Sequence, residues 1–104
     1  MVLYNVTTHV EPSVQEDWLL WMRQELIPQL LGTSRLKEIK IFKVVAEQDQ
    51  GGVSYAVQHF FESKENLNHF LKELGPATRK KSEERYGNRI LYFETELHLM
   101  EEYS

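Results

Sequence analysis

Histidines are the first residues to consider as metal ligands or general bases, and the chain has four: His9, His59, His69 and His98. None of them is paired with another histidine at metal-ligand spacing, and there is no cysteine. Haem iron normally needs an axial protein ligand, and nothing marks out one histidine for that role. His69 lies opposite the apolar stripe of its predicted helix, whereas His59 and His98 lie on predicted strands and could point into an interior shared between the sheets of two subunits. The sequence therefore predicts no metal site and no cofactor.

Four polar side chains form the best candidate for a catalytic or ligand-orienting cluster: Asn5, Thr7, Gln58 and His59. They come from the first and third predicted strands, which we expect to be adjacent. The competing interpretation of His59 is simple packing, because a strand histidine is more often a satisfied core residue than a base or a ligand.

Aromatic side chains could wall a binding site. Trp18 is in phase with the apolar stripe of its helix and is expected in the core, whereas Trp21 lies at the edge of that stripe. A pocket with aromatic walls and few polar groups suits a small, flat, apolar ligand, although core packing again competes. The predicted ligand-binding residues are Asn5, Thr7, Trp21, Tyr55, Gln58, His59 and Tyr92.

Several function classes are disfavoured by composition and motif. A net charge of −4 and a pI near 5.5 argue against nucleic acid as a partner. No hydrophobic stretch approaches the ~20 residues that span a bilayer, so we expect no membrane partner and a cytoplasmic location. There is no Gly-rich phosphate loop and no nucleophile elbow.

The elements that must position these residues follow from hydrophobic periodicity. Val2–Val10 alternates with a period of two and is predicted to be a strand, after which Pro12 and Ser13 end it. Ser13 and Glu16 have the spacing of a capping box, and a helical stripe begins at Val14. Pro28 should kink that helix, and Gly32 should end it.

The rest of the chain supplies three more predicted strands and a second helical region. Residues 36–47 are predicted to be a strand, 48–52 a hairpin connection and Val53–Phe61 a central strand with apolar groups on both faces. A helix capped by Ser63 should break at Gly75-Pro76, and a further charged helical segment should follow up to Gly87. In that segment Arg79 is one turn from Glu83, and Lys80 is one turn from Glu84, so these charges are expected to pair weakly on a solvated face. The last strand runs from Asn88.

The element order is β-α-β-β-α-β, which predicts an α+β, ferredoxin-like fold for a single domain over residues 1–104. In this fold both helices cover one face of a four-stranded antiparallel sheet. Every predicted strand keeps apolar residues on both faces, and a bare apolar sheet face would invite association. We therefore expect a homodimer with the two sheets face to face; the alternative is a monomer with an amphipathic outer face.

The chain resembles the dimeric α/β-barrel superfamily and, more closely, an uncharacterised bacterial family of domains of unknown function within it. The segments that carry the likeness are Tyr4-Asn5-Val6-Thr7, Trp18-Leu19-Leu20-Trp21-Met22, Ile27-Pro28, the run from Gly51 to Gln58, Pro76-Ala77 and Arg85-Tyr86-Gly87. The superfamily includes cofactor-free monooxygenases, muconolactone isomerase-like proteins and haem-binding relatives. Similar sequences often carry histidines where this chain has Leu26 and Leu74, which weakens any enzyme activity implied by the resemblance.

Three functional hypotheses follow. The first is a cytoplasmic homodimeric binding or accessory protein that holds a small hydrophobic or aromatic molecule. The second is a cofactor-free monooxygenase-like or isomerase-like enzyme acting on an aromatic substrate. The third is a structural dimer without a ligand. An enzyme needs a cavity with at least one polar side chain facing its centre, whereas a pure interaction module would have that space filled.

Overall fold

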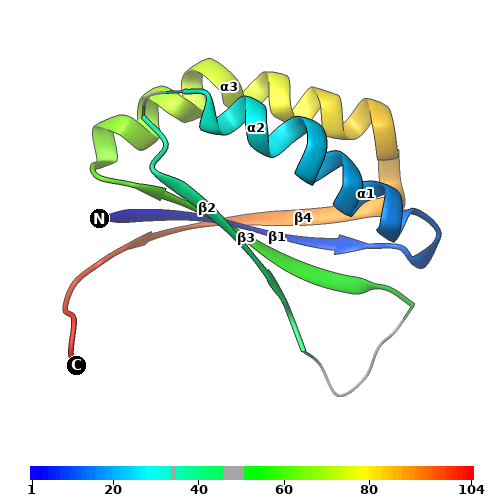
Figure 1. The fold of residues 1–104 in the computed structure, drawn as a ribbon, viewed down its shortest axis with the longest axis horizontal. Coiled ribbons are helices and arrows are strands. Elements are labelled where there is room, and N and C mark those ends of the chain that lie inside the picture. The colour runs from blue at the N-terminus through cyan, green and yellow to red at the C-terminus, as the bar shows by residue number, and fades with distance from the viewer. Residues whose placement is uncertain (34, 46–50) are drawn as a thin grey trace.

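The computed structural model describes residues 1–33, 35–45 and 51–104. Four strands form one antiparallel sheet in the order β2-β3-β1-β4, and the helices lie on one side of it (Figure 1). The strands are β1 (Val2–Val10), β2 (Glu38–Lys43), β3 (Val53–Phe61) and β4 (Ile90–His98). The α+β, ferredoxin-like fold is confirmed.

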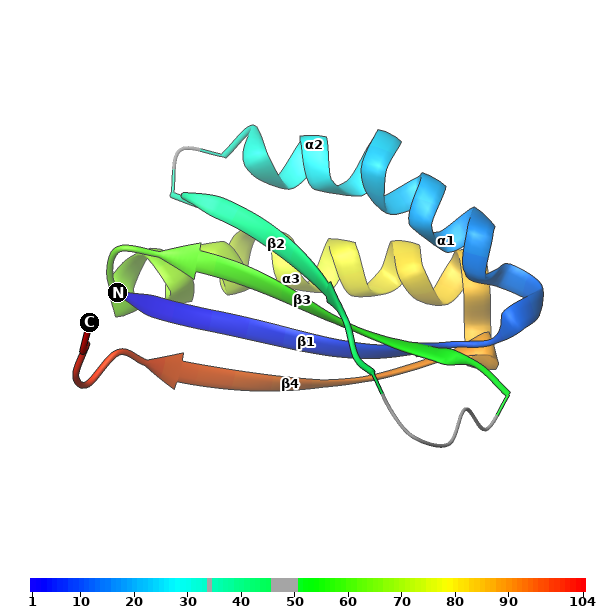
Figure 2. The same cartoon turned by 60° about the horizontal axis from the view of Figure 1, so that its bottom comes forward.

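The two central strands are β3 and β1, which pair along their full nine-residue lengths, from Val2 opposite Phe61 to Val10 opposite Val53. Figure 2 shows the four strands side by side in this order. Gly52 lets the chain enter β3 beside β1, because a Cβ atom there would lie 2.6 Å from both His9 Nε2 and the Val10 carbonyl oxygen. The prediction that β3 is a central strand is confirmed.

The predicted second strand is too long. β2 ends at Lys43, and Val44 and Val45 follow outside regular structure. The predicted end at Glu47 and most of the hairpin connection, residues 48–50, lie outside the described residues. The last strand begins at Ile90 rather than Asn88, because the short helical turn η3 (Gly87–Arg89) precedes it.

The first helical region has four parts: η1 (Pro12–Val14), α1 (Gln15–Trp21), the π-helical η2 (Met22–Leu26) and α2 (Ile27–Leu31). The interruption expected from Pro28 therefore takes the form of a widened turn just before it, which relieves the crowding between a proline ring and the carbonyl four residues back. The predicted capping box of Ser13 and Glu16 does not form. Ser13 lies within η1, and its hydroxyl donates to the Glu11 carboxylate at 3.3 Å.

The predicted break at Gly75-Pro76 is also wrong, because α3 runs without interruption from Lys64 to Tyr86. Proline disfavours helical backbone at the preceding residue through clashes with the backbone amide and the Cβ atom of that residue, and Gly75 lacks the Cβ atom. The predicted cap is confirmed, since Ser63 Oγ accepts a hydrogen bond from the Asn66 backbone amide at 3.2 Å.

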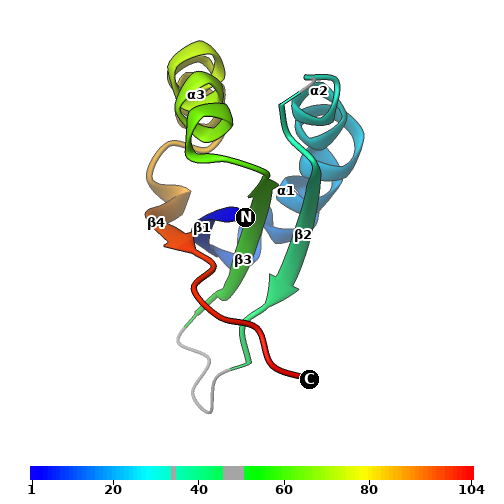
Figure 3. The ribbon, with the colours of Figure 1, turned by 90° about the vertical axis from the view of Figure 1, so that its left-hand side faces the viewer.

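The core lies between the helices and the sheet, where Phe61, Leu67 and Val10 are fully buried. Figure 3, viewed along the strands, shows both helical regions on the same side of the sheet. We call the opposite side the open face. Its apolar side chains are exposed: Phe42, Leu91, Phe93 and Leu97 have exposed fractions of 49, 66, 63 and 46 %.

Candidate functional site

A cavity of about 100 Å³ lies between the sheet and the two helical regions. Its interior is mainly aromatic and aliphatic. Its two charged groups, Arg79 and Glu94, come from α3 and the edge strand β4, whereas β1 and β3 add polar side chains. The apolar lining includes Val6, Trp18, Trp21, Met22, Leu26, Leu30, Val57, Phe70, Leu71 and Ile90. The polar and tyrosine lining consists of Tyr4, Thr8, His59, Thr78, Arg79, Ser82, Tyr92 and Glu94.

The tryptophans form rigid walls. Trp18 stacks on Tyr55 with ring centroids 5.1 Å apart, and Gln15 fixes that tyrosine by donating to its hydroxyl at 2.8 Å. Trp21 meets Tyr86 edge to face at 5.6 Å. Both tryptophans are buried, so they serve the core and the cavity at once.

A polar network outside the cavity holds the Trp21 wall. The Tyr86 hydroxyl donates to Asp17 at 2.8 Å, and Arg85 approaches the same carboxylate at 3.4 Å. Burial, together with the bond to Asp17, raises the pKa of Tyr86 to about 12. The network ties the start of the first helical region to the end of α3.

His59 is the one buried histidine among the described residues, with an exposed fraction of 6 %. Its Nδ1 lies 3.0 Å from the Tyr4 carbonyl oxygen, so Nδ1 carries the proton and donates it, and Nε2 is an acceptor. Burial lowers the pKa of His59, because the charged imidazolium loses its hydration there. A neutral imidazole therefore lines the cavity at neutral pH.

An ion pair, Arg79 with Glu94, lies at the edge of the cavity, with Arg79 Nη2 3.1 Å from Glu94 Oε1. Arg79 pairs with Glu94 on β4 rather than with Glu83, one turn away on its own helix, because α3 presents the guanidinium to β4. Burial and the neighbouring Glu94 raise the pKa of Tyr4 above its ordinary value, so its phenol stays protonated. Tyr4, Arg79 and Glu94 are not among the predicted site residues, although Tyr4 and Glu94 share the helix-facing phase of their strands.

The predicted polar cluster forms only in part, because Asn5, Thr7 and Gln58 share one face of the sheet and His59 lies on the other. Asn5 is opposite Gln58 in the register and lies on the open face, where its Nδ2 donates to Thr7 Oγ1 at 3.0 Å. His59 is opposite Tyr4 and points to the helix side. Consecutive strand residues face opposite sides of a sheet, so Gln58 and His59 cannot join one cluster.

The seven predicted ligand-binding residues therefore divide into two groups. Trp21, His59 and Tyr92 line the cavity, and Tyr55 supports its wall from behind Trp18. The other three, Asn5, Thr7 and Gln58, lie on the open face. Asn5 Oδ1 is buried there and has no hydrogen-bond partner among the described residues.

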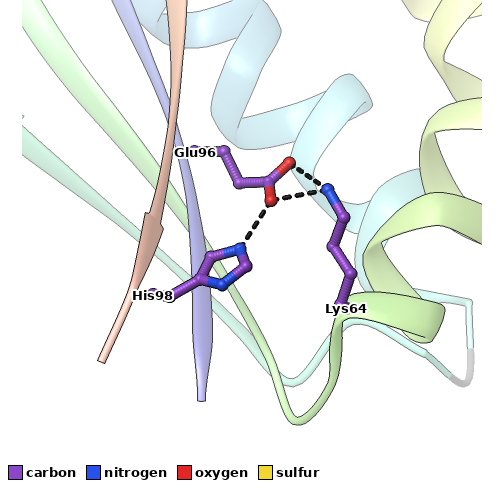
Figure 4. A network of polar contacts seen from close by, with 3 residues as sticks. All are labelled: Lys64, Glu96 and His98. Carbon is purple, nitrogen blue, oxygen red and sulfur yellow. Dashed lines mark hydrogen bonds and ion pairs between the residues drawn. The ribbon is translucent and has the colours of Figure 1, made fainter. Parts of the chain in front are cut away.

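The remaining histidines are away from the cavity. His98 Nε2 lies 2.6 Å from Glu96, which also pairs with Lys64 at 2.5 Å (Figure 4). His98 is half-exposed on the helix side of the edge strand, and His59 also points to the helix side. The expected position in an interior shared between two sheets is therefore wrong for both residues. His9 bonds Ser54 at 3.1 Å, and His69 is exposed. In the described ranges no three His, Asp or Glu side chains gather as a metal site, and no helix is long and apolar enough to cross a membrane.

Comparison with solved structures shows the same fold in distant proteins. A candidate antibiotic biosynthesis monooxygenase from Deinococcus radiodurans has a TM-score of 0.72 and 8 % identity, covering 100 % of this chain and 97 % of its own. A dimeric ferredoxin-like protein from an uncultured marine organism has a TM-score of 0.70 and 14 % identity, with coverages of 100 and 99 %. An ethyl tert-butyl ether D family protein from Bacillus halodurans has a TM-score of 0.67 and 14 % identity, with coverages of 96 and 100 %.

These likenesses establish the ferredoxin-like fold and leave the chemistry open, because folds host many functions. No curated protein matches the chain in sequence. The model of a domain of unknown function, DUF4286, matches residues 1–100, and the chain belongs to that family.

Proposed function

We propose that this protein is a cytoplasmic homodimer that packs its two open faces together and holds a small, flat, apolar molecule in the cavity of each subunit. The observation that carries the ligand proposal is the cavity itself, since its lining is mostly aromatic and aliphatic with a few polar groups. The cytoplasmic location rests on the sequence alone.

Cavity size limits the ligand. Apolar cavities of about 150 Å³ bind benzene, so about 100 Å³ suits one aromatic ring at most, with further atoms extending through the open side. A polycyclic ligand would have to leave most of its rings outside. We therefore propose a single-ring molecule.

Two observations support the dimer. The open face exposes four large apolar side chains, a pattern that marks an association surface. One structure of the same fold is described as dimeric. Two equivalent sheets packed about a two-fold axis would account for both.

A cofactor-free oxygenase or isomerase acting on an aromatic substrate is the second candidate. The observation that favours it is the presence of two proton acceptors, the neutral His59 imidazole and the Glu94 carboxylate, on the lining of one cavity. Chemical change of a bound aromatic compound, followed by mass spectrometry, would distinguish this candidate from simple binding.

The ligand proposal is tested with toluene as the probe and the fluorescence of Trp18 and Trp21, which line the cavity, as the signal. We expect saturable binding that Ser82→Leu abolishes, because the larger side chain occupies the cavity from α3. Lys80→Leu is the matched control, since it adds the same side chain to the same helix at an exposed position outside the lining. No saturable signal, or equal loss in both variants, would contradict the proposal and leave the structural dimer without a ligand.

A further inference from the structure

Glu94 is the one carboxylate among the described residues that line the cavity, and Arg79 is the one guanidinium. Glu94 lies on β4 opposite Val6 of β1, in the phase that faces the helices. About a third of its side chain, 36 %, is exposed. A charged acceptor thus stands on the rim of an otherwise apolar cavity.

The carboxylate retains the capacity to accept another hydrogen bond. An ionised carboxyl group has two oxygens and about four lone-pair positions. Arg79 Nη2 takes one position on Oε1 at 3.1 Å. The Tyr4 hydroxyl, which remains a protonated phenol, also faces this carboxylate.

The charge balance at the rim disfavours an anionic ligand. The positive charge of Arg79 is already balanced by the Glu94 carboxylate. A ligand carboxylate would therefore place a second negative charge beside a single guanidinium. His59 adds a second acceptor, because its Nδ1 proton is committed to the Tyr4 carbonyl oxygen. The cavity lining thus favours a neutral ligand that donates a hydrogen bond.

We infer that the cavity selects a single-ring aromatic alcohol, a phenol, whose ring lies against Trp18 and Trp21 and whose hydroxyl donates to Glu94. This inference rests on the proposed function and adds the chemical class of the ligand. A site that accepts a hydroxyl proton discriminates against an analogue without it, because the site's polar group is then left unpaired. Aromatic ethers, hydrocarbons and acids should bind more weakly than the phenol.

The test compares four probes with one ring each, p-cresol, 4-methylanisole, toluene and p-toluate, on the full chain by tryptophan fluorescence. We expect p-cresol to bind about 10-fold more tightly than 4-methylanisole. This factor is the low end of the range for a hydrogen bond to a charged group, because Glu94 is partly exposed. In Glu94→Gln this preference should fall to about 2-fold, because the amide is a neutral acceptor. The preference is read relative to toluene binding in the same variant, and far-ultraviolet circular dichroism checks that the variant is folded.

The outcomes separate this inference from the proposed function. Saturable toluene binding with equal affinities for p-cresol and 4-methylanisole would overturn the phenol assignment and leave the ligand site standing. Tighter binding of p-toluate than of p-cresol would also overturn it, because Arg79 would then be the recognition group. If none of the probes binds, the ligand site and the phenol assignment both fail.

Discussion

Substitution of Leu97 by aspartate tests whether the open face is a dimer interface. Leu97 lies on that face opposite Leu3 of β1, with 46 % of its surface exposed. Leu20 lies on α1, on the helix side of the molecule, and is exposed to the same extent, 46 %. Leu20→Asp is therefore matched in residue type, exposure and introduced charge, and differs only in the face that it changes.

The expected effect follows from the area that a partner would cover. Full burial of a leucine side chain contributes about 1.5–3 kcal/mol, so covering the exposed half of Leu97 contributes about 1 kcal/mol per subunit. A two-fold axis places the substitution in the interface twice, which gives about 2 kcal/mol, or about 30-fold in the dissociation constant. This is a lower bound, since the variant also leaves an unpaired carboxylate in an apolar interface.

Sedimentation velocity over a concentration series measures the dissociation constant directly. We expect Leu97→Asp to shift the dimer toward monomer by at least about 30-fold, a value set by the burial argument, while Leu20→Asp leaves the constant unchanged. Far-ultraviolet circular dichroism of both variants checks that the fold is intact. A wild-type protein that sediments as a monomer at micromolar concentration would refute the reasoning, and so would equal effects of the two variants.

Three further predictions concern stability. Because burial lowers the pKa of His59, the unfolded chain binds a proton that the folded chain does not bind as the pH falls below about 6.5. The free energy of unfolding should therefore be highest above that pH and decline below it. His59→Asn keeps a donor for the Tyr4 carbonyl oxygen and should flatten this part of the pH profile in urea titrations. Pro76→Ala should raise the free energy of unfolding by about 1–3 kcal/mol, since alanine restores an amide donor inside α3 and relieves ring crowding. An unchanged or lower urea midpoint would contradict the cost assigned to a proline inside this helix. Ser63→Ala should lower the free energy of unfolding by about 1 kcal/mol, because the hydrogen bond that caps the Asn66 amide is lost. Ser63→Asp should retain most of the stability in the same urea titration.

Much of the local structure was predictable because it depends on neighbours in the chain. The period of two in Val2–Val10 and the β-branched and aromatic composition of Val53–Phe61 identified both central strands, and Ser63 marked the start of α3. The separation of Gln58 from His59 was also predictable, since consecutive strand residues face opposite sides. The continuity of α3 through Pro76 was not, because the usual rule for proline assumes a Cβ atom on the residue before it.

The candidate site depended on contacts between distant parts of the chain. Arg79 has a helical neighbour at Glu83 in the sequence, yet its partner is Glu94, because α3 packs over the edge strand. Tyr4 gave no chemical signal in the sequence and joins this rim only through the pairing of β1 with β4. Periodicity along the chain determined the elements and the two faces of each strand. Only the strand register and the packing of the helices decided which faces meet, because these depend on the shape and burial of side chains far apart in the sequence.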